Sequence, residues 1–158
     1  MIIEAKKATM KKQMLQSCIR KQQSLIDDFK DRIQALLQTE GLGNEEEYDN
    51  TEMSAMQQRI DEISGLHEAL IFANNEMLLL QMMEAAPDRI FTEAEPGAVV
   101  VTSLGTFFIA VSTEQFQVKN ESFIGLSGKS PFFLAMQGKK AGDTFSYHGV
   151  TYSILDVF

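Results

Sequence analysis

Two stretches of the sequence carry the same heptad-like apolar pattern, arranged as mirror images around a short acidic segment. The first stretch alternates spacings of four and three residues between its seam positions, which are Leu15, Ile19, Gln22, Ile26, Phe29, Ile33 and Leu36. The second stretch has seven corresponding positions, at Met53, Met56, Ile60, Ile63, His67, Leu70 and Asn74. This spacing is typical of two helices that pack along a common seam. The sequence therefore predicts a long antiparallel helical hairpin.

A chain reversal at residues 44–45 would pair the two seams in reverse order. Phe29 would then lie beside Ile60, and Gln22 would face His67. A polar residue in one seam opposite a polar residue in the other is a way to fix register. We therefore expect Gln22 and His67 to have a structural role rather than a ligand-binding or catalytic one.

Glycine and helix-capping residues predict where the two helices of the hairpin begin and end. The first helix is predicted over residues 5–38, and Gly41 and Gly43 supply the backbone freedom that a reversal needs. Asn44 begins a capping-box pattern, so the return helix is predicted to start there and to end near residue 83.

Charge is distributed unevenly along the chain, which has a net charge of −8. The expected tip of the hairpin, residues 39–46, and the residues just after it are rich in carboxylates. A basic cluster precedes the tip in the first helix and consists of Lys6, Lys7, Lys11, Lys12, Arg20 and Lys21. This cluster is either a solvated helix face or a binding surface, and the sequence favours neither.

The sequence lacks the features that are typical of disulfide-stabilised, metal-binding, nucleotide-binding and membrane-spanning proteins. The only cysteine, Cys18, cannot form an intramolecular disulfide and is expected to be a small packing residue rather than a nucleophile. The chain has no metal-type Cys/His cluster, no phosphate-binding glycine loop and no run of about 20 apolar residues. The charged start lacks the apolar region of a signal peptide. We expect a cytoplasmic protein with no membrane association.

The pattern changes after the second helix. Residues 85–96 are predicted to be a linker, and β-branched or aromatic runs bounded by turn residues follow it. These runs predict strands, and Pro131 begins a short predicted helix; the segments are 98–102, 106–112, 115–119 and 151–157 for strands and 131–137 for the helix. The expected class is α+β, with a helical hairpin over 1–84 and a small, mostly antiparallel β-rich domain over 97–158.

The motifs of the β-rich part occur in a defined order. Ser130-Pro131 is followed by Ala135, then by the GKKAGD sequence of residues 138–143, and finally by Tyr152 and Ile154. With the hairpin before it, this set resembles the Gre-type transcript cleavage factors that bind bacterial RNA polymerase, and the resemblance covers nearly the whole chain. It implies an FKBP-like fold for residues 97–158, without isomerase activity.

The resemblance also implies a function. In this family the hairpin enters the secondary channel of a backtracked RNA polymerase, where tip carboxylates help to hold a second Mg²⁺ ion and to position a water molecule. Hard cations such as Mg²⁺ take carboxylate ligands. The chain would then be an auxiliary factor, not an enzyme, and would meet Mg²⁺ and the 3′ end of the nascent RNA only within the polymerase complex. We expect it to act as a monomer.

The tip departs from the family pattern at two positions. Gly41 and Asn44 stand where the family carries an aspartate and its catalytic glutamate. We therefore expect weak cleavage stimulation, or modulation of transcription without cleavage. The remaining catalytic candidates are Glu40, Asn44, Glu45 and Glu46, and of these Glu45 and Glu46 are the candidate Mg²⁺ ligands.

Each tip candidate also has a structural interpretation. Asn44 can act as a helix cap, and Glu45 and Glu46 can serve as first-turn charges. Leu42, Glu47 and Tyr48 agree with the family. The candidate partner-binding residues are Ser130, Pro131, Glu47 and Tyr48.

Two other functions remain open on the sequence. One is a chaperone or protein-binding module that is unrelated to transcription, and the other is a purely structural coiled coil. Among residues 132–134, some side chains are expected to fill the core of the β-rich part, and an exposed aromatic side chain there would suit docking.

Overall fold

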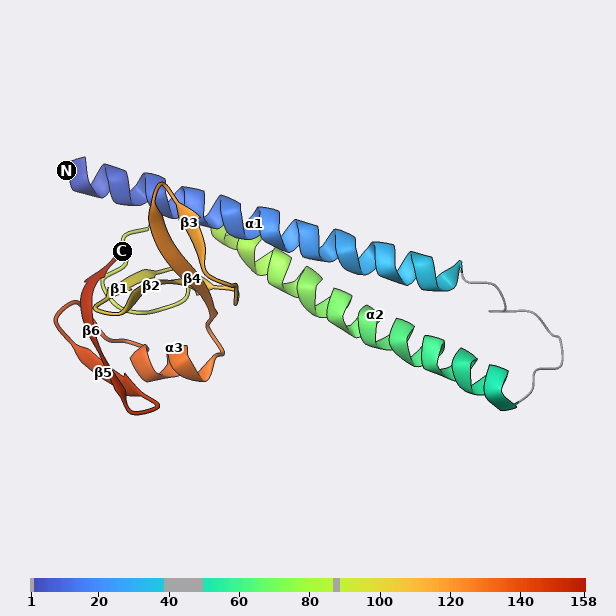
Figure 1. Cartoon of the computed structure of the whole chain (residues 1–158). Helices are drawn as coiled ribbons and strands as arrows, with labels where there is room; N and C mark the ends of the chain where they lie inside the picture. The colour runs from blue at the N-terminus through green and yellow to red at the C-terminus, as the bar shows by residue number, and fades with distance from the viewer. Residues whose placement is uncertain (1, 39–49, 87–88) are drawn as a thin grey trace. The chain divides into compact units, whose positions relative to one another are not determined.

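Two long helices precede a six-stranded sheet in the computed structural model, which describes residues 2–38, 50–86 and 89–158 (Figure 1). Helix α1 spans Ile2–Leu37 and helix α2 spans Asn50–Ala85. The expected α+β class, with two N-terminal helices before a β-rich part, is confirmed. Within the described ranges, no helix combines the length and apolarity that crossing a membrane requires.

The chain divides into two compact units. The sheet unit comprises Met1–Arg20 and Leu78–Phe158, and the helical unit comprises Lys21–Met77. The sheet unit thus contains the first part of α1 and the end of α2. The division expected from the sequence, at residues 1–84, 85–96 and 97–158, remains a prediction about separable domains.

The sheet has the strand order β3-β4-β2-β1-β6-β5. Strands β2 and β4 pair in parallel, and the other neighbouring strands pair antiparallel. The strands are β1 (Val99–Thr102), β2 (Gly105–Ala110), β3 (Phe116–Val118), β4 (Glu121–Ser127), β5 (Thr144–Tyr147) and β6 (Val150–Val157). Helix α3 spans Pro131–Met136 and lies between β4 and β5 in the chain.

Most of these elements match the sequence prediction. Strands β1, β2, β3 and β6 and helix α3 lie where they were expected, within a few residues. The mostly antiparallel character is also confirmed. Strands β4 and β5 were not predicted, and the parallel pairing of β4 with β2 was therefore missed.

Both faces of the sheet are buried, as alternation along β2 illustrates. Phe107 and Ile109 pack in a core with Phe133 of α3. Phe108 packs on the opposite face in a second core that includes Met14 of α1. Because the two central strands have apolar partners on both faces, each contains a continuous apolar run, Val99–Val101 in β1 and Phe107–Ala110 in β2. The second core also contains Cys18, Leu80, Val99, Ala110, Val111, Val118 and Phe123. Cys18 is fully buried there, as its expected packing role requires.

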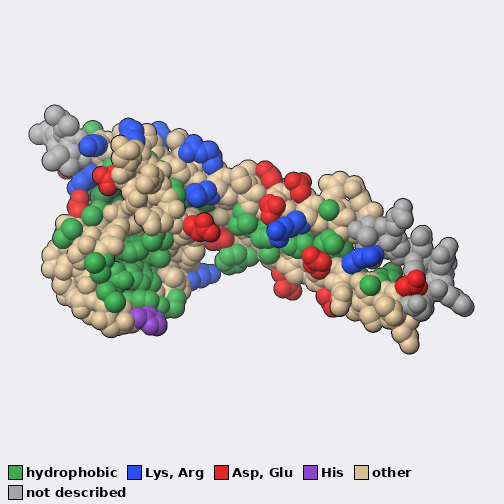
Figure 2. Space-filling view, viewed as in Figure 1, with side chains coloured by type: hydrophobic (Ala, Val, Ile, Leu, Met, Phe, Trp, Pro, Cys, Tyr) green, Lys and Arg blue, Asp and Glu red, His purple; other side chains and the backbone are tan. Residues whose placement is uncertain are grey.

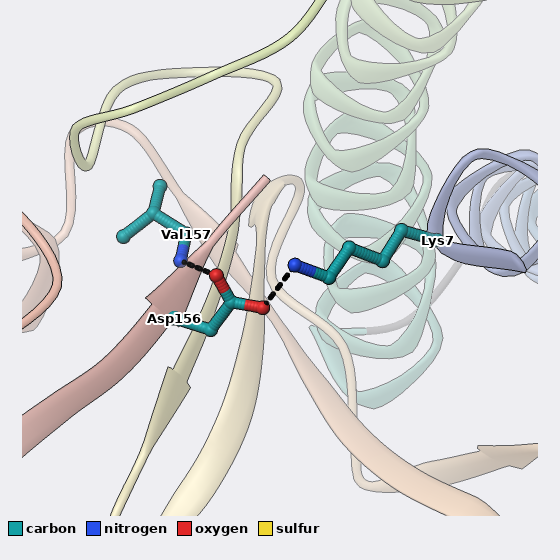
Figure 3. A network of polar contacts seen from close by, with 3 residues as sticks. All are labelled: Lys7, Asp156 and Val157. Carbon is teal, nitrogen blue, oxygen red and sulfur yellow. Dashed lines mark hydrogen bonds and ion pairs between the residues drawn. The ribbon is translucent and has the colours of Figure 1, made fainter. Parts of the chain in front are cut away.

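A polar contact joins the start of α1 to the last strand (Figure 3). Lys7 Nζ lies 2.6 Å from Asp156 Oδ2, and Asp156 Oδ1 accepts a hydrogen bond of 2.9 Å from the Val157 backbone N–H. The Lys7 ammonium also lies 5.4 Å from the centroid of the Phe158 ring. Since Lys7 and Asp156 are both partly exposed, this ion pair contributes about 0.2–1 kcal/mol to the free energy of unfolding.

The helical unit has a different register from the expected one. The buried Gln22 amide donates a hydrogen bond of 2.9 Å to the Ala73 backbone carbonyl, so the predicted pairing of Gln22 with His67 is wrong. Six residues along a helix correspond to about 9 Å. His67 is exposed and Ile60 is 43% exposed, so neither side chain is buried in a seam, and the contact of Phe29 with Ile60 remains a prediction.

The reason for the difference lies in the small residue opposite Gln22. Ala73 leaves its helix backbone accessible, and a backbone carbonyl is a strong acceptor for a buried amide. The seam pattern depends only on which residues are apolar. It therefore cannot predict a hydrogen bond from a side chain to the backbone of the other helix. Among the described residues of this unit, the buried ones are Gln22, Ile26, Ile33, Ala73 and Met77.

Glu76 makes the stability of the helical unit depend on pH. Burial raises the pKa of this carboxyl group above its ordinary value of 4.5, and a hydrogen bond from Gln22 offsets part of the rise. A raised pKa means that the folded state binds a proton more tightly than the unfolded state. The contribution of Glu76 to stability is therefore fully present below pH 4.5 and is lost as the pH rises through the folded pKa.

Replacing Glu76 by glutamine should remove this dependence. Glu76→Gln is expected to keep the hydrogen-bonding contact with Gln22 and to lose less stability than the wild type between about pH 4 and pH 7. Thermal unfolding followed by circular dichroism across this pH range measures the difference. The control is Glu68→Gln, which removes one charge from an exposed position of the same helix. Identical pH slopes for the wild type and Glu76→Gln would contradict the assignment.

Candidate functional site

Ser130 and Pro131 form a fixed turn at the start of α3. The Ser130 hydroxyl accepts a hydrogen bond of 3.2 Å from the Phe133 backbone N–H and donates one of 2.8 Å to the Ser127 carbonyl. The Ser130 backbone N–H also donates to the Ser127 carbonyl, at 3.0 Å. Pro131 occupies the first turn of the helix, where its missing N–H is not needed and its fixed φ suits the helix. Ser130 is half-buried in this turn, and Pro131 is exposed.

The side chains of the three residues after Pro131 lie in different environments. Phe133 is 1% exposed and fills the core, whereas Leu134 is 57% exposed. Phe132 is half-buried and is the centre of a group of aromatic rings. Its ring centroid lies 4.9 Å from Phe107, 5.1 Å from Tyr147, 5.2 Å from Tyr152 and 5.7 Å from Phe145. The prediction that some of these side chains fill the core is confirmed by Phe133, and the exposed side chain is a leucine and not an aromatic residue.

An apolar surface therefore adjoins the Ser130 turn. Tyr147 and Tyr152 are half-buried beside Phe132, and Leu134 is exposed on α3. Figure 2 shows hydrophobic side chains gathered on the face of the β-rich part that is turned toward the viewer. Because Phe132 is held by several rings and Pro131 by a capped turn, this surface is rigid before any partner arrives.

The GKKAGD segment, residues 138–143, has a structural role in this turn-rich region. The Asp143 carboxylate accepts a hydrogen bond of 2.8 Å from the Lys140 backbone N–H. Gly142, with φ +94°, donates from its backbone to the Ile154 carbonyl at 2.8 Å, and Ile154 donates back to the Asp143 carbonyl at 2.9 Å. Gly138, with φ +76°, donates to Ala94 at 2.8 Å. These bonds fasten the end of α3 to β6 and to the segment before β1.

The tip candidates lie outside the described residues. This applies to Glu40, Asn44, Glu45 and Glu46, the proposed catalytic or metal-binding residues, and to Glu47 and Tyr48, the proposed partner-binding residues. Of the candidate site residues, the structure therefore places Ser130 and Pro131. Within the described ranges, no group of three or more His, Cys, Asp or Glu side chains is arranged to hold a metal ion.

Sequence reasoning missed two features of the site region. The first is the group of rings around Phe132, whose members come from β2, β5 and β6 and meet only in the folded sheet. The second is Leu134, which a helical pattern alone does not distinguish from its buried neighbour Phe133. A signal for the second was available, since only one face of a six-residue helix such as α3 can meet the sheet.

Removing the cap of α3 should weaken the turn. Ser130→Ala deletes the acceptor of the Phe133 N–H and is expected to cost about 1–2 kcal/mol of unfolding free energy. Ser130→Asp should retain most of the stability because aspartate caps helices about as well as serine. Chemical denaturation of the three proteins measures these values. Equal losses in Ser130→Ala and Ser130→Asp would show that the cap is not the important interaction.

Comparison with known proteins gives a structural likeness but no sequence relative. No family model matches the chain, and no curated protein matches it. Among solved structures, that of the transcription factor Gfh1 aligns over 94% of this chain and 93% of its own length, with 12% sequence identity and a TM-score of 0.30. A likeness at this score defines neither the fold nor the function of the chain.

Proposed function

We propose that this protein is a Gre-like factor that binds bacterial RNA polymerase and modulates transcription. Its docking surface is the Ser130 turn together with the exposed side of α3. Its tip, residues 39–46, enters the secondary channel of the polymerase. The β-rich part, residues 97–158, has an FKBP-like fold in this proposal.

One observation carries the proposal. Ser130-Pro131 opens the ordered set of motifs in which the chain resembles the Gre-type factors, and it begins a capped helix that presents Pro131 and Leu134 to solvent. Exposed apolar side chains on a rigid support are typical of protein-binding surfaces. The ring of Phe132, which lies between them in the sequence, is fixed by its aromatic neighbours. Binding therefore requires little ordering of the surface.

The proposed chemistry belongs to the polymerase, and the protein is not itself an enzyme. In this proposal the carboxylates of Glu45 and Glu46 are ligands of a Mg²⁺ ion that is shared with the polymerase active site, close to the 3′ end of the nascent RNA. Asn44 cannot supply a carboxylate, and Gly41 has no side chain. We therefore propose a factor that stimulates cleavage weakly, or one that occupies the channel without causing cleavage.

Binding to purified core RNA polymerase, measured by biolayer interferometry, tests the docking surface. Leu134→Glu and Pro131→Glu place a charge on the surface and are each expected to weaken binding by at least about tenfold, which corresponds to 1.4 kcal/mol. The control is Leu104→Glu, which makes the same change at another exposed leucine of the sheet unit, 61% exposed in the turn between β1 and β2. Wild-type affinity in a double variant at Pro131 and Leu134 would reject this placement. No binding of the wild type to the polymerase would reject the proposed function.

A further inference from the structure

A second apolar surface of the sheet unit is lined by none of the residues of the Ser130 turn or of α3. It is a groove of about 980 Å³ formed by the first turns of α1, the last turns of α2 and the segment 89–97. Three large apolar side chains that line it are notably exposed: Leu79 by 39%, Met82 by 70% and Ile90 by 78%. A concave site with several exposed apolar side chains is a candidate for binding, whereas single exposed side chains are ordinary. We call it the α1–α2 groove.

The floor of the α1–α2 groove is firmly built around Phe91. The Lys11 ammonium lies 3.8 Å from the centroid of the Phe91 ring, and the Arg89 guanidinium carbon lies 4.8 Å from it. Arg89 is also paired with Glu95 at 2.7 Å. Gly97 has φ +97°, and a Cβ at this position would lie 2.9 Å from Phe91 Cζ. The glycine therefore lets the end of the Phe91 ring lie close to the backbone.

The charge of the α1–α2 groove is opposite to that of the chain. Its described lining contains three basic residues, Lys11, Lys12 and Arg89, and one acidic residue, Glu84. The chain as a whole has 22 acidic and 14 basic residues. Lys11 and Lys12 belong to the basic cluster that the sequence left without a role. The Lys11 ammonium is buried against Phe91, so the exposed basic rim consists of Lys12 and Arg89. A basic rim around an apolar floor suits a partner that is both apolar and anionic.

We propose that the α1–α2 groove binds an acidic amphipathic helix of a partner protein. Its apolar residues, at spacings of three and four, would lie on Leu79, Met82 and Ile90, and its Asp and Glu side chains would face the basic rim. Met82 and Met83 both line the groove, and methionine side chains adapt to the shape of an incoming apolar surface. A nucleic acid would match the charge but would leave the apolar floor uncovered. This proposal is independent of polymerase binding and of the Ser130 turn.

The test uses a model ligand and the full chain. The probe is a fluorescein-labelled peptide of about 15 residues, or four helical turns, with leucine at the helical spacing and glutamate between. A second peptide has lysine in place of every glutamate. Fluorescence anisotropy is expected to show binding of the acidic peptide at least tenfold tighter than that of the basic peptide, and more so at low salt.

Two variants connect this binding to the groove. Met82→Glu with Ile90→Glu is expected to weaken binding of the acidic peptide by at least tenfold, and both positions are exposed enough to change without unfolding the protein. Lys12→Glu should weaken binding severalfold at low salt, whereas the matched change Lys30→Glu, at an exposed position of α1 in the helical unit, should not. Leu134→Glu at the Ser130 turn should also bind the peptide normally.

Several results would overturn the proposal. These are no measurable binding of the acidic peptide at millimolar concentration, equal binding of the two peptides, or unchanged binding in the double variant. Displacement of the peptide by an oligonucleotide whose own binding is unaffected by the double variant would identify a nucleic-acid site instead. A dimer seen by sedimentation velocity and abolished in the double variant would identify a second copy as the occupant.

Discussion

Replacing Phe133 by alanine is expected to lower the free energy of unfolding of the protein by about 3–5 kcal/mol. The Phe133 side chain is 1% exposed and packs in the core with Phe107, Ile109 and Phe145. Its removal deletes apolar contacts on the inner face of α3 and leaves a cavity that the sheet cannot readily fill. Since whole domains are stable by only about 5–15 kcal/mol, this loss is a large fraction of the total.

The neighbouring residue provides a matched control. Leu134 follows Phe133 in α3 but is 57% exposed, so Leu134→Ala should change stability by no more than about 0.5 kcal/mol. Urea denaturation of the two variants and the wild type gives both values from one experiment. A loss below about 1 kcal/mol in Phe133→Ala, or equal losses in both variants, would mean that α3 is not anchored as described.

Restoring the two missing tip acids is expected to raise transcript cleavage by at least about tenfold. The change is Gly41→Asp with Asn44→Glu, which gives the tip the acids that the Gre-type pattern carries. Carboxylates at these positions would supply the ligands that Mg²⁺ prefers, and the held cation would offset negative charge in the transition state; a tenfold effect requires only about 1.4 kcal/mol of that stabilisation. The measurement is cleavage of radiolabelled RNA in a backtracked polymerase complex.

The same assay contains its own controls. Gly41→Asn with Asn44→Gln introduces amides without charge and should leave cleavage at the wild-type level. Strong cleavage by the unmodified protein that is lost in Glu45→Ala or Glu46→Ala would contradict the expectation. It would mean that these glutamates already perform the metal-binding role.

The sequence predicted elements well where local patterns decide them. Helix α3 was predicted because Pro131 starts it and apolar residues follow, and the strands β1, β2 and β6 because β-branched and aromatic residues fill them. Strand β4 was missed because Gly125 in its middle resembles a break. In the sheet this glycine is required, since a Cβ there would lie 2.3 Å from the Val111 carbonyl oxygen.

Strand β5 was missed for a different reason. Its four residues lie between the turn at Gly142 and the turn at His148, where φ is +50°, and so short a run is hard to distinguish from loop. The strand is defined by its pairing with β6, from Thr144 with Ser153 to Tyr147 with Val150. Such pairing depends on the fold as a whole and not on the four residues alone.

The candidate site was predictable only in part, and for similar reasons. The Ser130-Pro131 start of α3 is a local motif, so it could be identified from sequence. The rings around Phe132 and the bond from Gln22 to Ala73 join residues that are distant in the chain. The Gln22 bond also replaced the expected partner His67 by a backbone carbonyl, which no pattern of side chains represents.

Site-specific crosslinking tests the central claim most directly, namely that the tip enters the polymerase secondary channel. A photo-crosslinking side chain in place of Glu46 is introduced into the full chain, and a second protein carries it in place of the exposed Asp28 of α1 as a control. After irradiation with core RNA polymerase, the crosslinked residues are identified by mass spectrometry. The account predicts that position 46 crosslinks to residues next to the polymerase active site, and that Leu134→Glu reduces the yield. Crosslinks from position 46 only to the outer surface of the polymerase, or none at all, would contradict it.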